Sequence, residues 1–173
     1  MNSENAFIPL NIAVLTVSDT RTEDNDKSGK LLVEGLTRAG HTLADKKIVA
    51  DNIYAIRSVV SQWIADPTVH AVISTGGTGV TGRDGTPEAI SVLLDKQIEG
   101  FGELFRMISY QEIKTSSLQS RALAGVANGT YLFCLPGSSG ACKTGWDEII
   151  QAQLDYRTRP CNLTMLIPRL LET

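Results

Sequence analysis

Residues 71–85 decide the fold; they read AVISTGGTGVTGRDG. The first five have the length and apolar, β-branched content of a buried strand, and five of the chain's 15 glycines fall in the ten residues that follow. In parallel α/β sheets such loops lie at the carboxyl edge of the strands, where ligands bind. The stretch therefore predicts a ligand-binding loop at the end of a buried parallel strand.

On both sides of this stretch, apolar runs of strand length alternate with longer segments of helical period. This alternation predicts the α/β class, with parallel strands joined by crossover helices. The almost unbroken apolar run at 12–17 is typical of a central strand. Thr86 and Pro87 resemble a helix start, with threonine as the N-cap and proline at the first helical position. Strands are expected at 12–17, 44–50, 71–75 and 131–135, and helices at about 31–39, 52–64, 86–96, 101–114, 118–126 and from the 136–140 loop to about 158.

The length of 173 residues suits one domain. We expect a single domain over 1–173, with residues 1–10 as an N-terminal extension and 160–173 as a C-terminal tail that is apolar enough to pack against another surface. The net charge of −3 gives no field that favours nucleic acid or an anionic membrane, so neither partner is expected. No signal peptide or membrane-spanning run is recognised, so the sequence indicates a soluble, cytoplasmic protein.

Three cysteines form no CxxC pair: Cys134, Cys142 and Cys161. Their odd number and spacing favour reduced thiols over a disulfide framework or a zinc site. Cys142 lies near an expected helix start, which can lower a thiol pKa, but no base accompanies it. His41 and His70 have no partner at catalytic or metal-binding spacing, so both are interpreted as structural.

The glycine-rich loop predicts an anion site. Glycines allow backbone N–H groups to converge on one point, and the following helix N-terminus adds partial positive charge. The interleaved Thr75, Thr78, Thr81 and Arg83 favour phosphate binding over the alternative, a tight turn that needs glycine only for its geometry.

Residues 77–82 also match G-x-G-x-x-G, which leaves a nicotinamide oxidoreductase as another hypothesis. In a dinucleotide site the glycines enter the helix directly, whereas Arg83, Asp84 and Gly85 intervene here. The Lys-Ser/Thr pair of a Walker A loop is absent from this position, which excludes that motif.

Two carboxylates stand at expected strand-to-helix junctions, Asp51 and Asp84. Because parallel strands end at one edge of a sheet, we expect both acids at that edge, where Mg²⁺ commonly bridges carboxylates to phosphate oxygens. The alternative is that each acid only caps a helix. Polar loops after the first and last strands, at 18–20 and 137–140, are expected to line the same cleft. Ser120 and Arg121 add a hydroxyl and a guanidinium, and the alternative for Arg121 is a surface charge on an expected helix.

Taken together, these motifs resemble the MoaB/MogA family of molybdenum cofactor biosynthesis proteins, in particular its bacterial MoaB branch. The resemblance covers about residues 8–162. The residues that carry it are Thr75-Gly76-Gly77-Thr78-Gly79, Arg83-Asp84-Gly85-Thr86-Pro87-Glu88, Gly100-Phe101-Gly102-Glu103, Ser120-Arg121 and Leu135-Pro136-Gly137-Ser138.

The resemblance implies a three-layer α/β/α molybdopterin-binding fold with a mainly parallel sheet. It further implies that the chain adenylylates molybdopterin with Mg-ATP and releases pyrophosphate. Asp51 and Asp84 match the acids needed for this transfer, through Mg²⁺. Substrate and nucleotide positions carried over are Ser18, Asp19, Thr75, Gly76, Gly77, Thr78, Gly79, Thr86, Pro87, Glu88, Ser120, Arg121, Pro136, Gly137 and Ser138.

The resemblance also implies a homo-oligomer, either a trimer or a hexamer. The C-terminal tail and residues 101–113 are candidates for its interface. The alternative function is a molybdopterin-binding or scaffold protein that uses the same pocket without chemistry.

Overall fold

The computed structural model describes residues 6–173 and is built on one six-stranded sheet. Residues 1–5 of the expected N-terminal extension lie outside the described part. The strand order is β2-β1-β3-β6-β5-β4, and only β5 runs against the other strands. The strands are β1 Asn11–Val17, β2 Thr42–Val49, β3 Ala71–Thr75, β4 Lys96–Gln97, β5 Leu123–Ala127 and β6 Thr130–Leu135.

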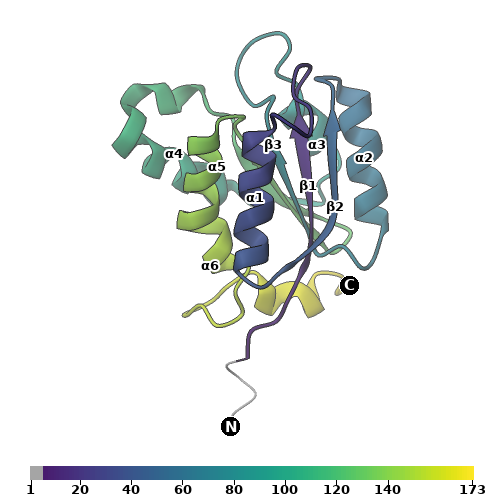
Figure 1. Ribbon diagram of the computed structural model, residues 1–173. Helices are drawn as coiled ribbons and strands as arrows, with labels where there is room; N and C mark the ends of the chain where they lie inside the picture. The colour runs from purple at the N-terminus through teal and green to yellow at the C-terminus, as the bar shows by residue number, and fades with distance from the viewer. Residues whose placement is uncertain (1–5) are drawn as a thin grey trace.

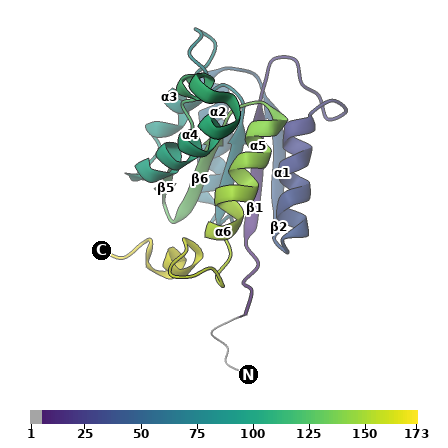
Figure 2. The same cartoon turned by 90° about the vertical axis from the view of Figure 1, so that its left-hand side faces the viewer.

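Helices cover both faces of the sheet and give the three layers expected (Figures 1 and 2). One face carries α1 Lys27–Arg38, α4 Glu99–Ile113 and α5 Ser139–Gly145. The other face carries α2 Ile53–Ala65 and α3 Thr86–Ser91. The mainly parallel α/β/α fold predicted from the sequence is therefore confirmed.

The central strand β1 shows why the sheet is buried on both sides. Ile12 and Val14 point into the apolar cluster under α1, α4 and α5, while Ala13 and Leu15 point into the cluster under α2 and α3. All four side chains are fully buried. Successive strand residues alternate between faces, so an unbroken apolar run supplies both halves of the core.

The helix expected at 86–96 is shorter than predicted. It begins at Thr86 after the N-cap Gly85 and ends at Ser91, so Thr86 is not its cap. The chain then pairs with the sheet edge: Asp95 N–H donates to Val126 O (2.8 Å) and Ile98 N–H to Ala124 O (2.8 Å). These backbone bonds form β4 where local sequence favours a helix.

The prediction of a helix at 118–126 is wrong. A 3₁₀ segment occupies Lys114–Gln119 and β5 follows at Leu123–Ala127, fully enclosed between β4 and β6. Short apolar runs do not distinguish a buried strand from a helix. Asn128 and Gly129 give the positive φ angles (47° and 80°) of a tight hairpin turn between β5 and β6, and this Asn-Gly pair was the signal available in the sequence.

The last helix ends earlier than about 158. After α5, a π-helical turn at Trp146–Ile150 leads into α6 Gln151–Gln153. The C-terminal tail then forms a 3₁₀ segment, Thr164–Arg169, at the end of the molecule opposite the β3–α3 loop (Figure 1). The Tyr131 hydroxyl donates to Leu163 O (2.8 Å), and Ile167 packs on the core, so the surface that the tail packs against is its own domain.

Candidate functional site

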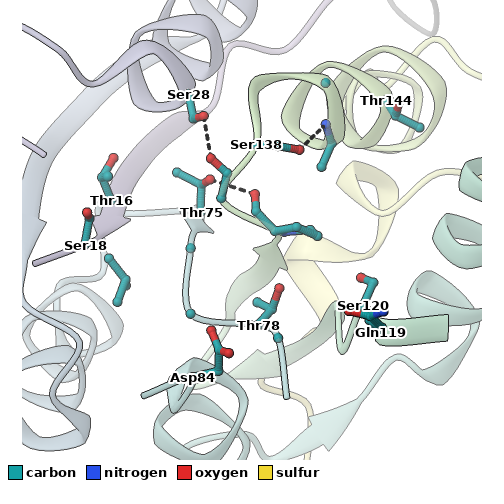
Figure 3. Close-up of a pocket in the computed structure, with 18 of the residues that line it drawn as sticks. Thr16, Ser18, Ser28, Thr75, Thr78, Asp84, Gln119, Ser120, Ser138 and Thr144 are labelled. Atoms are coloured by element: carbon teal, nitrogen blue, oxygen red, sulfur yellow. Dashed lines mark hydrogen bonds between the residues drawn. The ribbon is translucent and has the colours of Figure 1, made fainter. Parts of the chain in front are cut away.

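A cavity of 580 Å³ opens at the carboxyl ends of β1, β3 and β6 (Figure 3). Loops after these strands form its floor, and α4 with the following 3₁₀ segment forms a wall. Of the residues predicted for the site, the cavity is lined by Ser18, Thr75, Gly76, Gly77, Thr78, Gly79, Asp84, Ser120, Pro136, Gly137 and Ser138. The expectation that these separated loops share one cleft is met.

The loop after β3 needs glycine at two successive positions. Gly76 has φ +102° and Gly77 has φ +68°, a region that side chains with a Cβ rarely adopt. A Cβ on Gly76 would also lie 2.2 Å from Val17 O. The turn therefore passes directly over the end of β1 and brings the loops of β1 and β3 into contact.

Threonines fix this loop on both sides. The Thr86 hydroxyl donates to Gly76 O (2.8 Å), and Thr86 N–H donates to Gly77 O (3.0 Å). The Thr75 hydroxyl donates to Pro136 O (2.9 Å), which joins the loop to that of β6 (Figure 3). Thr86 thus holds the loop from behind, outside the cavity lining.

Both predicted acids press against the glycine loop. An ideal Cβ on Gly77 would lie 2.9 Å from Asp51 Oδ1, and one on Gly79 would lie 2.7 Å from Asp84 Oδ2. Asp84 lines the cavity, whereas Asp51 lies behind Gly77 and is not part of the lining. The absence of side chains at 77 and 79 thus lets two carboxylates approach the loop backbone closely.

A third carboxylate, Asp19, completes the acidic edge. Its Oδ1 accepts a hydrogen bond from Asp51 N–H (3.1 Å), and its Oδ2 pairs with the Arg83 guanidinium. Asp51 N–H is thereby bonded to Asp19, while the Asp51 carboxylate and the Thr86 hydroxyl both approach Gly77. The capping role considered for Asp51 belongs instead to its neighbour Asn52, which accepts from Tyr54 and Ala55 N–H.

Burial and neighbouring charge give the two acids different pKa shifts. Partial burial, together with the negative charges of Asp19 and Asp84, raises the pKa of Asp51 above its ordinary value. Hydrogen bonds from the Thr81 hydroxyl and backbone N–H lower the pKa of Asp84. The like charges that raise the Asp51 pKa indicate an edge where a cation would be stabilised.

Arg121 and Glu88 lie beside the cavity and do not line it. The Arg121 guanidinium donates to backbone carbonyls of the glycine loop and pairs with the Glu88 carboxylate. Pro87 is buried in the first turn of α3. These predicted positions support the loop that holds Asp84.

Ser138 and Ser28 organise the opposite side of the cavity. Ser138 caps α5 by accepting from Ala141 N–H (3.1 Å), and the Ser28 hydroxyl donates to Gly137 O (2.8 Å) (Figure 3). Cys142, in the same turn, has its pKa raised to about 11 by burial. The lowered thiol pKa considered for this cysteine is therefore wrong.

Sequence reasoning missed the residues near the start of α1. Asp26 is buried, accepts from the Thr16 hydroxyl (2.8 Å) and pairs with Lys46 (2.9 Å). Hydrogen bonds and the charge of Lys46 outweigh burial and lower the Asp26 pKa. Asp26 lies several positions before the helix expected at about 31–39, and no sequence motif marks it as part of the site.

The α4 wall was also missed. The cavity lining from α4 and the segment after it consists of Phe105, Ser109, Glu112, Ile113, Ser116 and Gln119. Figure 3 shows Gln119 and Ser120 together, across the cavity from Thr16 and Ser18. Phe105 is almost fully buried in the core behind this wall, so the side chains that the wall presents to the cavity are mainly polar.

Comparison with known proteins identifies the family to which the chain belongs. Residues 13–156 match the family described as a probable molybdopterin binding domain. The chain belongs to this family of molybdenum cofactor biosynthesis proteins. It is 57% identical over 156 residues to molybdenum cofactor biosynthesis protein B of Escherichia coli K12, with 90% of this chain and 92% of the relative covered. The corresponding Bacillus cereus protein is 47% identical, with 84% and 86% covered.

Solved structures of the family share the fold. A crystal structure of a molybdenum cofactor biosynthesis protein B superposes with a TM-score of 0.84 at 46% identity, covering 86% of this chain and 93% of that one. The tungsten cofactor synthesizing protein MoaB from Pyrococcus furiosus gives 0.70 at 37% identity, covering 82% and 90%. The predicted resemblance to the MoaB/MogA family is therefore confirmed, and the chain's role lies in molybdenum cofactor biosynthesis.

Proposed function

We propose that this protein is a molybdopterin adenylyltransferase: it transfers the adenylyl group of Mg-ATP to molybdopterin and releases pyrophosphate. The observation that carries the proposal is the pair Asp51 and Asp84, both held against the glycine loop at Gly77 and Gly79. The family match supports molybdopterin as the acceptor.

The transfer requires an oxygen of molybdopterin and the α-phosphorus of ATP to be held next to one another. The new phosphorus–oxygen bond forms as the bond to pyrophosphate breaks. In this chain the backbone of Gly76 to Gly79 would bind phosphate oxygens, while the polar wall with Ser109 and Gln119 would hold the pterin. Positioning of this kind supplies most of the rate in phosphoryl chemistry.

The carboxylates fit a magnesium ion that is shared with the nucleotide. Mg²⁺ is usually bound through one or two carboxylates plus substrate phosphates, and when bound it neutralises charge on the transferred group. Among residues 6–173, no cluster of three or more histidine, cysteine or carboxylate side chains is placed to hold a metal by itself. We therefore assign Asp51 and Asp84 as ligands that act together with ATP.

The test is turnover with molybdopterin, ATP and Mg²⁺, followed as pyrophosphate and adenylylated pterin. Asp51→Asn and Asp84→Asn should each lower kcat by about two orders of magnitude, the usual cost of removing one electrostatic contact to the transition state. Asp66→Asn is the matched control, because Asp66 follows α2 and its carboxylate accepts from the backbone N–H and the hydroxyl of Thr68. Full turnover in folded Asp84→Asn would contradict the assignment.

A non-catalytic molybdopterin carrier or scaffold is the second candidate. The observation in its favour is that Asp51 lies outside the cavity lining. It predicts tight pterin binding by the wild-type protein with no ATP-dependent product. A nicotinamide site is less well supported, since the chain from Gly82 to α3 passes through Arg83, Asp84 and Gly85 and does not enter the helix directly. A flat NADH titration would exclude it.

We propose further that the protein is a homo-oligomer, either a trimer or a hexamer. Exposed apolar side chains on α4 and just after it support this: Leu104, Met107, Tyr110, Ile113 and Leu118. Apolar surface gathered on one element is typical of an interface between subunits.

A cytoplasmic location without a nucleic-acid partner completes the proposal. Free thiols at all three cysteines support a reducing compartment, and the net charge of −3 gives no attraction to nucleic acid. Within the described residues, no helix is long and apolar enough to cross a membrane.

A further inference from the structure

Arg121 makes an unusual set of contacts at the rim of the cavity. Its Nε donates to Gly79 O (2.7 Å) and its Nη2 to Asp84 O (2.8 Å). Its own backbone N–H donates to Thr78 O (3.0 Å). The remaining edge of the guanidinium pairs with the Glu88 carboxylate. One side chain, delivered from the segment before β5, thus binds both ends of the loop segment 79–84.

These contacts fix the loop that holds Asp84. The carbonyls of Gly79 and Asp84 are five residues apart, and one planar guanidinium holds both at the spacing of its own N–H groups. Inside this segment, Asp84 accepts from Thr81 N–H (2.9 Å) and from the Thr81 hydroxyl (2.7 Å). The direction of the Asp84 carboxylate is therefore set by the segment that Arg121 closes.

Arg121 does not have the geometry of a phosphate-binding arginine. An arginine that binds a phosphate presents two parallel N–H groups to the ligand. Here Nε and Nη2 are directed to loop carbonyls, Nη1 is directed to Glu88, and the side chain is not part of the cavity lining. A ligand in the cavity would meet Asp84 and Gly79 before it met the guanidinium.

We propose that Arg121 is a positioning residue, supported by Glu88, that holds Gly79 and Asp84 in the arrangement needed for adenylyl transfer. The role of Asp84 in this inference rests on the proposed function. The claim that Arg121 holds the loop segment 79–84 does not depend on that function. It assigns Arg121 to the loop and not to the nucleotide or the pterin.

Amide hydrogen exchange tests the structural part without any substrate. In Arg121→Ala, the amides of Asp84 and Thr86, which donate to Thr81 O and Gly77 O, should exchange on the order of tenfold faster, because two charge-assisted hydrogen bonds are lost. Amides of β1 and β3 should keep their protection. Unchanged exchange at Asp84 and Thr86 would overturn the proposal.

Arg57→Ala is the matched control. Arg57 also donates to two backbone carbonyls, those of Ala89 (3.2 Å) and Glu88 (3.1 Å), but it approaches from α2 and both of these carbonyls lie in α3, after the 79–84 segment. Exchange at Asp84 should stay at the wild-type rate in this variant. Equal acceleration in both variants would mean a general loosening around α3 and would also overturn the proposal.

Lysine substitution separates positioning from direct binding. Arg121→Lys keeps the charge but cannot hold two carbonyls in one plane, so loop exchange should rise and kcat should fall about as far as in Arg121→Ala. Added guanidinium should restore part of the kcat of Arg121→Ala. The contrary result would be near-normal kcat and loop exchange in Arg121→Lys, together with a raised KM for ATP in Arg121→Ala. That result would show that Arg121 contacts the nucleotide directly through its charge.

A double-mutant cycle tests the role of Glu88. If Glu88 acts through Arg121, Glu88→Ala should slow turnover in the wild-type background and have no further effect in Arg121→Ala. Additive losses would contradict that coupling. If the wild-type protein forms no adenylylated product, the proposed function fails, and hydrogen exchange alone still decides whether Arg121 holds the loop.

Discussion

His41 and His70 each accept a backbone hydrogen bond that protonation would remove. His41 Nδ1 accepts from Leu10 N–H (3.1 Å) and His70 Nδ1 from Asn11 N–H (2.9 Å), at the entry to β1. Burial lowers the pKa of both; for His41 the charge of Asp155 opposes this only in part. Their interpretation as structural histidines agrees with these contacts.

The lowered histidine pKa values predict a loss of stability in mild acid. The folded state binds fewer protons than the unfolded chain, so the stabilisation is complete above the unfolded pKa of about 6.5 and declines as pH falls below it. The free energy of unfolding, measured with urea, should decrease from about pH 7 to pH 5. His41→Asn, which keeps an acceptor, should flatten part of this slope; a flat wild-type profile would contradict it.

The cysteines should differ sharply in reactivity. Burial raises the pKa of Cys134 to about 12 and that of Cys142 to about 11, whereas Cys161 is exposed. Because the thiolate is the nucleophile, iodoacetamide at pH 8 should label Cys161 alone in the native protein and all three cysteines in urea. Cys161→Ser should take up no label when folded. Native labelling of Cys142 would mean that the turn after β6 opens readily.

At the scale of elements, α1 depends on a close approach at Gly35. A Cβ on this residue would lie 2.8 Å from Trp146 Nε1 in the neighbouring π-helical turn. Gly35→Ala should lower the free energy of unfolding by about 1–3 kcal/mol, because overpacking outweighs the better helix propensity of alanine.

Gly100 in α4 is the control for this prediction, since a Cβ there meets nothing within 4 Å. Gly100→Ala should be neutral or stabilising by up to about 1 kcal/mol. Urea unfolding of both variants measures the difference. Equal effects would mean that α1 can shift away from Trp146 at little cost.

Helices and strands could be predicted from the sequence where the residue pattern is compatible with only one type of secondary structure. The runs at 12–17 and 71–75 are strands because both faces of the sheet bury them. The run at 118–126 is compatible with a helix or a strand, and its residues 123–127 form a strand because they pair with β6 in the sheet. The candidate site divides in the same way. Loops after parallel strands meet by topology, but the α4 wall and Asp26 reach the cavity only through tertiary packing, which leaves no local motif.

At the scale of the whole molecule, one side of α4 lines the cavity and another side exposes apolar side chains. Phe105 and Ser109 line the cavity, while Met107 is 60% exposed and Tyr110 48% exposed on the outer side of the same helix. An apolar outer face on the helix that forms the cavity wall is costly to leave in water. The proposed homo-oligomer would cover this face and hold the wall in place.

Sedimentation of the purified chain should therefore give a trimer or hexamer at micromolar concentration. Met107→Glu combined with Leu118→Glu should dissociate it, because burying two unpaired carboxylates in an interface opposes association. Tyr54→Glu is the control: Tyr54 is 75% exposed, but on α2, across the sheet. Because α4 also forms the cavity wall, the double variant must have the circular dichroism spectrum of the wild-type protein. That spectrum shows that dissociation does not result from unfolding. A monomeric wild-type chain would remove the interface, and the apolar face of α4 would then have to serve a different partner.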